Sequence, residues 1–428
     1  MIKKLILKFK QKKISVGIIG LGYVGLPISE RFVSAGINVI GVDSDPHKIK
    51  SLKKGLSYIK SRKLKNFRYF KKKKNNLSSD YNILKKCDAI LICLPTPLKG
   101  HKPNMSYIFN CAKKLKKVVR PFQLVVLEST VYPGATIELA NIIKQKKLNF
   151  GENFFIGYSP ERENPGDINF SYNTTPKVIS GLSKNCINLI DLLYSHIVKS
   201  RVKSKDIESA ELSKLLENLY RSVNIGLVNE LKMICDKLKI DIFQVIELAS
   251  TKNFGFQKFL PGPGLGGHCI PIDPYYLSWI SEKKGYKPKF ISIAGKINTS
   301  MPLWVVNKMI KYFKNKKPKV LILGVSYKKN IDDDRESPSF EIMKILKRKK
   351  IYFEYNDPYF KKVRKGRNNK ILKKSIQLNK KNLNKFSAVL LVTDHDSYDY
   401  KYIARNSKFI FDTRGKYKKY NFKNIIYC

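Results

Sequence analysis

The sequence lacks any apolar run long enough to cross a membrane. Runs such as VLILGV and AVLLVT are far shorter than the roughly 20 residues that a membrane-spanning helix needs. The start, MIKKLILKFKQKK, is basic, without the continuous apolar segment and small-residue cleavage site of a signal peptide. We therefore expect a cytoplasmic protein without a membrane span.

Cysteine and histidine are scarce, with seven and five among 428 residues. The cysteines are scattered singly, their number is odd, and none forms a CxxC pair, which excludes a disulfide framework and fits a reducing compartment. His268 precedes Cys269, but adjacent side chains diverge and no histidine cluster has the spacing of zinc ligands. We expect no bound metal.

Acidic residues are also few: the chain has 33 Asp and Glu but 84 Lys and Arg, which gives a formal net charge of +51. Such an excess raises the possibility of a nucleic-acid or anionic-membrane partner. The excess is mostly lysine spread along the whole chain, however, and not arginine interleaved with aromatic residues in one motif. We interpret it as a solvated surface bias that attracts anionic small ligands, with no specific nucleic acid as partner.

The order of predicted elements indicates an α/β protein. Residues 14–43 read as strand, glycine turn, helix and strand, and further apolar runs ending in turn residues follow at 88–98 and 123–134. Residues 206–248 contain one glycine and no proline, and their helical spacing predicts a long helix followed by shorter ones. A second strand, glycine, helix and strand series begins near residue 316. We expect two Rossmann-like, doubly wound domains at 1–199 and 316–428, joined by a helical middle domain at 200–310.

The segment GLGYVG matches the GxGxxG pattern of a dinucleotide-binding turn. Gly20 permits the tight turn, Gly22 allows the backbone to approach a pyrophosphate, and Gly25 allows close packing of helix and strand. Asp43 ends the next predicted strand, where its carboxylate would accept hydrogen bonds from the ribose hydroxyls and repel a 2′-phosphate. The motif therefore favours NAD over NADP.

Three further patterns carry possible chemistry. Lys214 and Asn218 lie at i and i+4 on one helix face, where they could stabilise an oxyanion or simply form a solvated face. Glu161 lies in the proline-bracketed turn YSPERENPG, in a position typical of functional loops. Cys269 follows the glycines of PGPGLGGHC, so it is either a small buried apolar residue or a nucleophile presented to a ligand that the glycines allow to approach. Asp273 could act as a base or cap a turn.

The chain resembles the nucleotide-sugar 6-dehydrogenase family along nearly its whole length. The segments that carry this resemblance occur in the family's order: GLGYVGLP, LPTPL, ESTVYPG, SPERENPGD, AELSKLLENLYRSVNIGLVNE, GPGLGGHCIPIDPYYL and YKKNIDDDRESP. The ending GGHCIPIDPYYLSW looks most like the branch that oxidises UDP-N-acetyl-D-glucosamine to the uronic acid for bacterial surface polysaccharides. UDP-glucose, UDP-N-acetylmannosamine and GDP-mannose remain alternative substrates.

The resemblance implies a four-electron oxidation that uses two NAD molecules in turn. The C6 alcohol gives up a hydride, Cys269 captures the aldehyde as a thiohemiacetal, a second hydride leaves, and water hydrolyses the thioester. The implied catalytic residues are Cys269, Lys214, Asn218, Asp273, Glu161 and Thr130.

The resemblance also implies a set of ligand-binding residues. For the cofactor they are Gly20, Gly22, Tyr23, Val24, Gly25, Asp43, Lys48, Thr96, Thr130 and Arg335. For the nucleotide sugar they are Glu161, Arg162, Lys214, Asn218, Phe259, Pro261, Gly262, Gly266, Lys328 and Arg414. The implied assembly is a homodimer or a higher homo-oligomer through the long helix, with Leu227, Leu231 and Ile234 as an apolar stripe.

The sequence departs from the family pattern at three positions. Pro165 stands where UDP-glucose enzymes carry a second glutamate, Ile272 replaces a frequent lysine, and Asn253 replaces a frequent proline. These changes concern substrate handling more than reaction type. Two other interpretations stay open, namely a two-electron oxidoreductase with a structural Cys269 and a degenerate nucleotide-sugar-binding scaffold.

Overall fold

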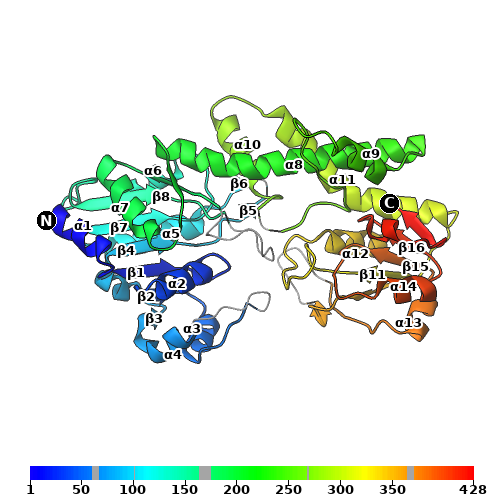
Figure 1. Cartoon of the computed structure of the whole chain (residues 1–428), viewed down its shortest axis with the longest axis horizontal. Coiled ribbons are helices and arrows are strands. Elements are labelled where there is room, and N and C mark those ends of the chain that lie inside the picture. The colour runs from blue at the N-terminus through cyan, green and yellow to red at the C-terminus, as the bar shows by residue number, and fades with distance from the viewer. Residues whose placement is uncertain (60–66, 101, 163–174, 268, 364–370) are drawn as a thin grey trace. The chain divides into compact units, whose positions relative to one another are not determined.

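The computed structural model describes residues 1–59, 67–100, 102–162, 175–267, 269–363 and 371–428. Two positions named in the sequence analysis, Pro165 and His268, therefore lie outside the described residues. The chain forms two compact units: an N-terminal unit of Met1–Glu217 with Tyr275–Tyr286, and a C-terminal unit of Asn218–Pro274 with Lys287–Cys428. Both units are α/β (Figure 1), which confirms the predicted fold class.

The N-terminal unit is built on an eight-stranded sheet in the order β10-β9-β8-β7-β4-β1-β2-β3. Its strand pairs are parallel except for β8 with β9. The bounds are β1 Ser15–Ile19, β2 Asn38–Val42, β3 Leu77–Ser78, β4 Ala89–Ile92, β7 Gln123–Leu127, β8 Phe154–Tyr158, β9 Lys177–Gly181 and β10 Arg201–Lys203. A separate antiparallel pair joins β5 Leu98–Lys99 to β6 Lys102–Pro103.

The central strands of this sheet are buried because helices of the same unit pack on them (Figure 1). One core cluster joins strand residues such as Val16, Ile18 and Leu91 to Phe9, Phe32 and other helical side chains. The helices are α1 Ile2–Lys10, α2 Gly25–Ser34, α3 Pro46–Lys53, α4 Phe67–Lys72, α5 Ser106–Lys116, α6 Ala135–Ile143 and α7 Lys184–Ser195.

The C-terminal unit contains a five-stranded parallel sheet in the order β12-β11-β15-β16-β17. The strands are β11 Val320–Leu323, β12 Phe353–Asn356, β15 Ala388–Leu391, β16 Ile410–Asp412 and β17 Ile425–Tyr427, and the pair β13 Lys362–Val363 with β14 Lys373–Lys374 is antiparallel. The helices are α9 Ile242–Ala249, α11 Lys289–Tyr312, α12 Pro338–Arg348, α13 Lys380–Lys385 and α14 Tyr400–Asn406.

Alternate residues of β11 enter two different cores, as the period of a strand requires. Val320 and Ile322 pack with side chains of α11 and α12. Leu321 and Leu323 pack with side chains of α13 and α14. Helices therefore cover both faces of this sheet, and the sheet is doubly wound as predicted.

Two helices continue from one unit into the other. They are α8 Ile207–Leu238 and α10 Asp273–Lys283. The long helix expected from 206 is thus present as α8, and α9 follows it. Within the described residues, no helix combines the length and the apolar character needed to traverse a bilayer.

Because β11 lies inside the sheet of the C-terminal unit, we predict that its core contacts stabilise that unit. Ile322 is fully buried, and its replacement by alanine should lower the free energy of unfolding by about 2–5 kcal/mol because a cavity remains. Trp304 lies in this unit and Trp279 in the other. Urea unfolding of a Trp279→Phe background, followed by Trp304 fluorescence, therefore reports on the C-terminal unit.

The matched control is Ile293→Ala, because Ile293 is 55% exposed on α11 of the same unit. The same atoms are removed there from a solvated site, so the free energy of unfolding should change by less than about 0.5 kcal/mol. Equal destabilisation by the two substitutions would contradict the assignment of β11 to the core.

Candidate functional site

The glycine turn after β1 has the geometry that dinucleotide binding requires. Gly20 has a φ of +89°, and a Cβ at Gly25 would lie 2.0 Å from the carbonyl oxygen of Gly20. Both positions therefore exclude larger residues. A Cβ at Gly22 would meet no atom within 4 Å, so the backbone there faces open space. The turn leads directly into α2, whose first-turn amides can bind an anionic group.

Asp43 links the end of β2 to this turn. It is 7% exposed, and its Oδ2 accepts hydrogen bonds from the backbone N–H of Leu21 at 2.8 Å and from Nζ of Lys48 at 2.9 Å. The hydroxyl of Tyr58 donates to the carbonyl of Leu21 from the other side. Sequence analysis predicted Asp43 and Lys48 as cofactor-binding residues but missed Tyr58, which lies in no recognised motif.

Glu161, Arg162 and Lys214 lie in the N-terminal unit and share a network. The backbone N–H of Arg162 donates to Oε1 of Glu161 at 2.8 Å, and its guanidinium lies 2.5 Å from Oε1 of Glu217. Nζ of Lys214 is 3.8 Å from Oε2 of the same Glu217. Glu217 on α8 thus connects the Glu161 turn with the Lys214 ammonium, a role that sequence analysis missed.

A buried ion pair lies behind the Glu161 turn. Nζ of Lys177 donates to Glu128 at 2.8 Å and to the carbonyl of Pro160 at 3.2 Å, and it lies 4.8 Å from the ring centroid of Tyr194. The hydroxyl of Tyr194 also donates to Glu128. Burial raises the pKa of Glu128 to about 6, and Lys177 opposes this increase. The cluster fixes the residue directly before Glu161.

Thr96 and Thr130 follow the ends of β4 and β7, at the edge of the sheet where β1 also ends. The carbonyl of Thr96 accepts a hydrogen bond from the hydroxyl of Tyr276 at 2.9 Å. In parallel α/β sheets, ligands bind at this carboxyl edge. Tyr23 and Val24 belong to the glycine turn described above.

Cys269, in the C-terminal unit, is exposed, whereas the other six cysteines are buried. The backbone N–H of Asp273 donates to the Cys269 carbonyl at 2.8 Å, where α10 begins. Nδ2 of Asn218 donates to Oδ2 of Asp273 at 2.6 Å. The structure therefore brings Asn218 to Asp273, four residues beyond the exposed thiol.

The glycines before Cys269 pack closely against Tyr327. A Cβ at Gly266 would lie 2.6 Å from Cβ of Tyr327, and one at Gly267, where φ is +86°, would lie 2.8 Å from the Tyr327 ring. The N–H of Gly267 also donates to the carbonyl of Arg335 at 2.9 Å. These glycines accommodate a neighbouring loop of the protein itself; approach of a ligand to them stays a prediction.

Tyr327 is therefore a further residue of this region that sequence analysis did not single out. Burial, together with the charges of Asp333 and Cys269, raises the pKa of its hydroxyl to about 12, while Arg335 and Arg221 lower it. The hydroxyl stays protonated near neutral pH and can only act there as a neutral donor or acceptor.

The predicted nucleotide-sugar residues of the C-terminal unit fall into two groups. Arg414 donates through Nε to the carbonyl of Val392 at 2.7 Å, and a Cβ at Gly262 would lie 2.8 Å from its guanidinium. Phe259, near Pro261, packs edge-on against Tyr220 with ring centroids 5.8 Å apart. The second group is Lys328, on the loop between β11 and α12. The same loop carries Arg335, which was predicted to contact the cofactor and forms a bidentate pair with Asp333.

A metal site is not evident in the part of the chain that the structure describes, where no three His, Cys, Asp or Glu side chains gather closely enough to coordinate an ion.

Three domains of one known family match the chain in order. The NAD binding domain of the UDP-glucose/GDP-mannose dehydrogenase family matches residues 13–198, its central domain matches 208–300, and its UDP binding domain matches 321–419.

Relatives extend over most of the chain. The Protein CapL of Staphylococcus aureus is 34% identical over 94% of this chain and 96% of its own length. A UDP-N-acetyl-D-glucosamine 6-dehydrogenase of Pseudomonas aeruginosa is 34% identical, covering 81% of this chain and 83% of its own. A solved UDP-D-ManNAc dehydrogenase from Pyrococcus horikoshii has a TM-score of 0.86 and 30% identity over 97% of this chain and 98% of its own. The chain therefore belongs to the UDP-glucose/GDP-mannose dehydrogenase family of NAD-binding nucleotide-sugar dehydrogenases.

Proposed function

We propose that the protein oxidises the C6 hydroxyl of a UDP-N-acetylhexosamine to the uronic acid, with two NAD molecules as hydride acceptors. The observation that carries this proposal is the ordered match to the NAD-binding, central and UDP-binding domains, together with one exposed cysteine in the glycine-rich loop. We favour UDP-N-acetyl-D-glucosamine as substrate, on the resemblance of that loop and the relatives of that name.

UDP-N-acetyl-D-mannosamine is the second candidate. It is supported by several relatives named as its dehydrogenases and by the solved Pyrococcus horikoshii structure with a TM-score of 0.86. The two sugars differ only in configuration at C2, so pocket shape decides between them.

The fit of NAD to the N-terminal unit follows from the glycine turn and Asp43. Open space beside Gly22 admits the pyrophosphate, and a nearly buried carboxylate at Asp43 offers an acceptor to the ribose hydroxyls. When bound, NAD would accept the hydride that leaves C6 of the sugar. Tyr23, Val24, Lys48, Thr96, Thr130 and Arg335 complete the proposed cofactor-binding set.

Cys269 is the proposed covalent catalyst. Its sulfur adds to the aldehyde carbon to form a thiohemiacetal, loss of the second hydride and a proton gives a thioester, and water then releases the acid and restores the thiol. Oxidation from alcohol to acid thus proceeds without free aldehyde. Lys214 and Asn218 stabilise the oxyanion that forms at each tetrahedral stage.

The Asn218–Asp273 hydrogen bond orients the carboxylate of Asp273, which we propose activates or positions the hydrolytic water. Glu161 assists as acid or base, and Thr130 orients a water or the substrate near the nicotinamide. Arg162, Phe259, Pro261, Gly262, Gly266, Lys328 and Arg414 are the remaining proposed contacts to the nucleotide sugar.

These roles correspond to a proposed division of labour along the chain. Residues 1–199 bind NAD, residues 200–310 contribute the cysteine loop and the dimer contact, and residues 316–428 bind the nucleotide sugar. The apolar side chains Leu227, Leu231 and Ile234 on α8 are 52%, 36% and 47% exposed, which supports a homodimer that covers them.

Cofactor stoichiometry tests the reaction. A panel of UDP- and GDP-sugars, each supplied in limiting amount with excess NAD, should yield two NADH per molecule of the true substrate and the corresponding uronic acid by mass spectrometry. A two-electron oxidoreductase would give one NADH, and a binding scaffold would give none, so either result would refute the proposed reaction.

Selective alkylation tests the role of the cysteine. Because Cys269 is the exposed cysteine and the other six are buried, brief treatment of the native enzyme with iodoacetamide should modify Cys269 first and abolish turnover. Bound UDP-sugar should slow the modification. Peptide mapping locates the adduct, and inactivation that tracks another cysteine would contradict the assignment.

Substitution of Cys269 separates chemistry from binding. Cys269→Ala should retain NAD and UDP binding but lose uronic-acid formation, because no sulfur is present to capture the aldehyde. Cys269→Ser should accumulate a slowly hydrolysed ester. The control is Cys235→Ala, at a buried cysteine on α8. Uronic acid produced by Cys269→Ala at near the wild-type rate would make the thiol structural.

Cofactor preference tests Asp43. We expect kcat/KM for NAD to exceed that for NADP by more than about tenfold, equivalent to about 1.4 kcal/mol. Asp43→Asn removes the negative charge and should narrow this ratio. Asp45→Asn is the control, since Asp45 caps α3 through the N–H of His47. Equal use of both cofactors by the wild-type enzyme would refute the assignment.

A further inference from the structure

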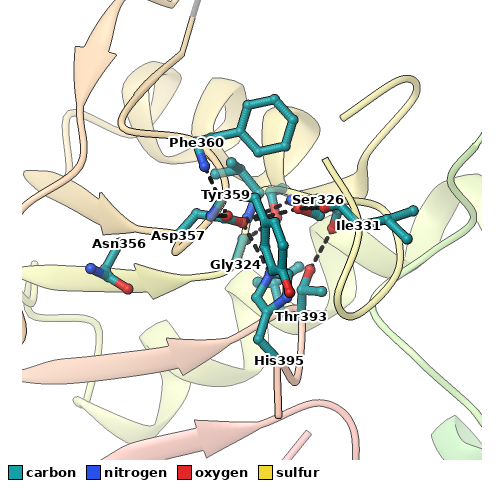
Figure 2. Close-up of polar contacts among 12 residues, drawn as sticks. Gly324, Ser326, Ile331, Asn356, Asp357, Tyr359, Phe360, Thr393 and His395 are labelled. Atoms are coloured by element: carbon teal, nitrogen blue, oxygen red, sulfur yellow. Dashed lines mark hydrogen bonds and ion pairs between the residues drawn. The ribbon is translucent and has the colours of Figure 1, made fainter. Parts of the chain in front are cut away.

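The loop that carries Tyr327, Lys328 and Arg335 is hydrogen-bonded to a buried histidine in the turn after β15. We define the Lys328 loop as residues 325–336, between β11 and α12. The backbone N–H of Asn330, near its middle, donates to Nδ1 of His395 at 2.9 Å. His395 follows β15 and is fully buried (Figure 2).

The second ring nitrogen of His395 contacts Asp357. Nε2 lies 3.1 Å from Oδ2 of Asp357, which also accepts from the N–H groups of Val325 and Ser326 at 2.7 and 3.1 Å. Because Nδ1 must accept from an N–H, the ring proton belongs on Nε2, where it donates to Asp357. His395 is thus in the tautomer that binds carboxylate and loop together.

The loop also forms two side-chain hydrogen bonds to the turn after β15. The hydroxyl of Thr393 donates to the carbonyl of Ser326 at 2.6 Å, and Nδ2 of Asn330 donates to Asp396 at 2.6 Å. These bonds constrain the start and the outer part of the loop. The backbone N–H of Asn330 is held instead by the buried side chain of His395. A φ of +63° at Asn330 shows that this point adopts a left-handed turn.

We propose that His395 is a positioning residue that sets the Lys328 loop for UDP-sugar binding. It acts through the Asn330 N–H, two residues from Lys328, and does not itself touch the substrate. The inference rests on the proposed function only in assigning Lys328 to the nucleotide sugar. The hydrogen-bond geometry of His395 stands independently of that function.

Two substitutions separate the two bonds of the imidazole. In His395→Asn the amide is placed near Nδ1, so its oxygen can still accept from the Asn330 N–H, while the donor to Asp357 is lost. In His395→Gln the amide nitrogen reaches the Nε2 position and can still donate to Asp357, while the acceptor for Asn330 is lost. The pair thus removes either the loop bond or the carboxylate bond.

UDP itself is the probe, measured by titration calorimetry on the full chain. We expect His395→Gln to weaken UDP binding by about tenfold or more and His395→Asn to stay within about threefold of wild type. NAD affinity should be unchanged in both. Equal weakening by both variants would make His395 a merely structural residue and overturn the proposal, as would unchanged binding in His395→Gln.

Amide hydrogen exchange distinguishes failure of the proposal from failure of the proposed function. Exchange across 326–336 should accelerate at least about tenfold in His395→Gln and remain near wild type in His395→Asn, with no ligand present. If the wild-type protein does not bind UDP, both the proposed function and the role of His395 in UDP binding are refuted. The exchange pattern would in that case still confirm the hydrogen bond between His395 and the Lys328 loop. The same exchange rates in both variants would exclude that contact.

Discussion

In each unit, the turn after the first strand depends on a buried carboxylate at the end of the second strand. In the N-terminal unit Asp43 accepts from the N–H of Leu21, and in the C-terminal unit Asp357 accepts from the N–H of Val325. The preceding residues, Gly20 and Gly324, each have a φ of +89°. Each carboxylate thus satisfies backbone donors that the turn after the first strand would otherwise leave buried and unpaired, at a cost of about 1–3 kcal/mol for each such donor.

The two carboxylates differ in the side chains that surround them. Asp357 accepts additional bonds from Tyr359 and from His395. Burial raises its pKa, but the His395 and backbone donors outweigh burial and the net shift is downward. Asp43 has Lys48 as a side-chain partner instead. The strand register makes Thr96 the counterpart of His395, since each is the fourth residue after Ile92 and Leu391, which pair with the equivalent strands β1 and β11.

Buried lysines in this very basic chain have defined partners. Lys177 pairs with Glu128, and Lys232 donates to the carbonyl of Cys428 while lying 5.7 Å from the ring centroid of Phe243. Burial lowers the pKa of Lys232 to about 8, against the opposing effect of Cys428 and Asp412. Burying an ammonium costs several kcal/mol unless partners compensate. Lys177 and Lys232 therefore support the folded structure through these buried contacts.

The sequence by itself determined the fold class, the glycine turn, the long helix α8 and the family, because strand and helix periods and glycine spacings are local patterns. Tertiary structure alone decided which distant side chains support these motifs. Lys177 reaches Glu128 across 49 positions, and His395 accepts from Asn330 across 65. Glu217 lies between Arg162 and Lys214 only once the chain is folded. A hydrogen bond depends on distance and direction in space, and a single sequence does not record which remote donor will face which acceptor.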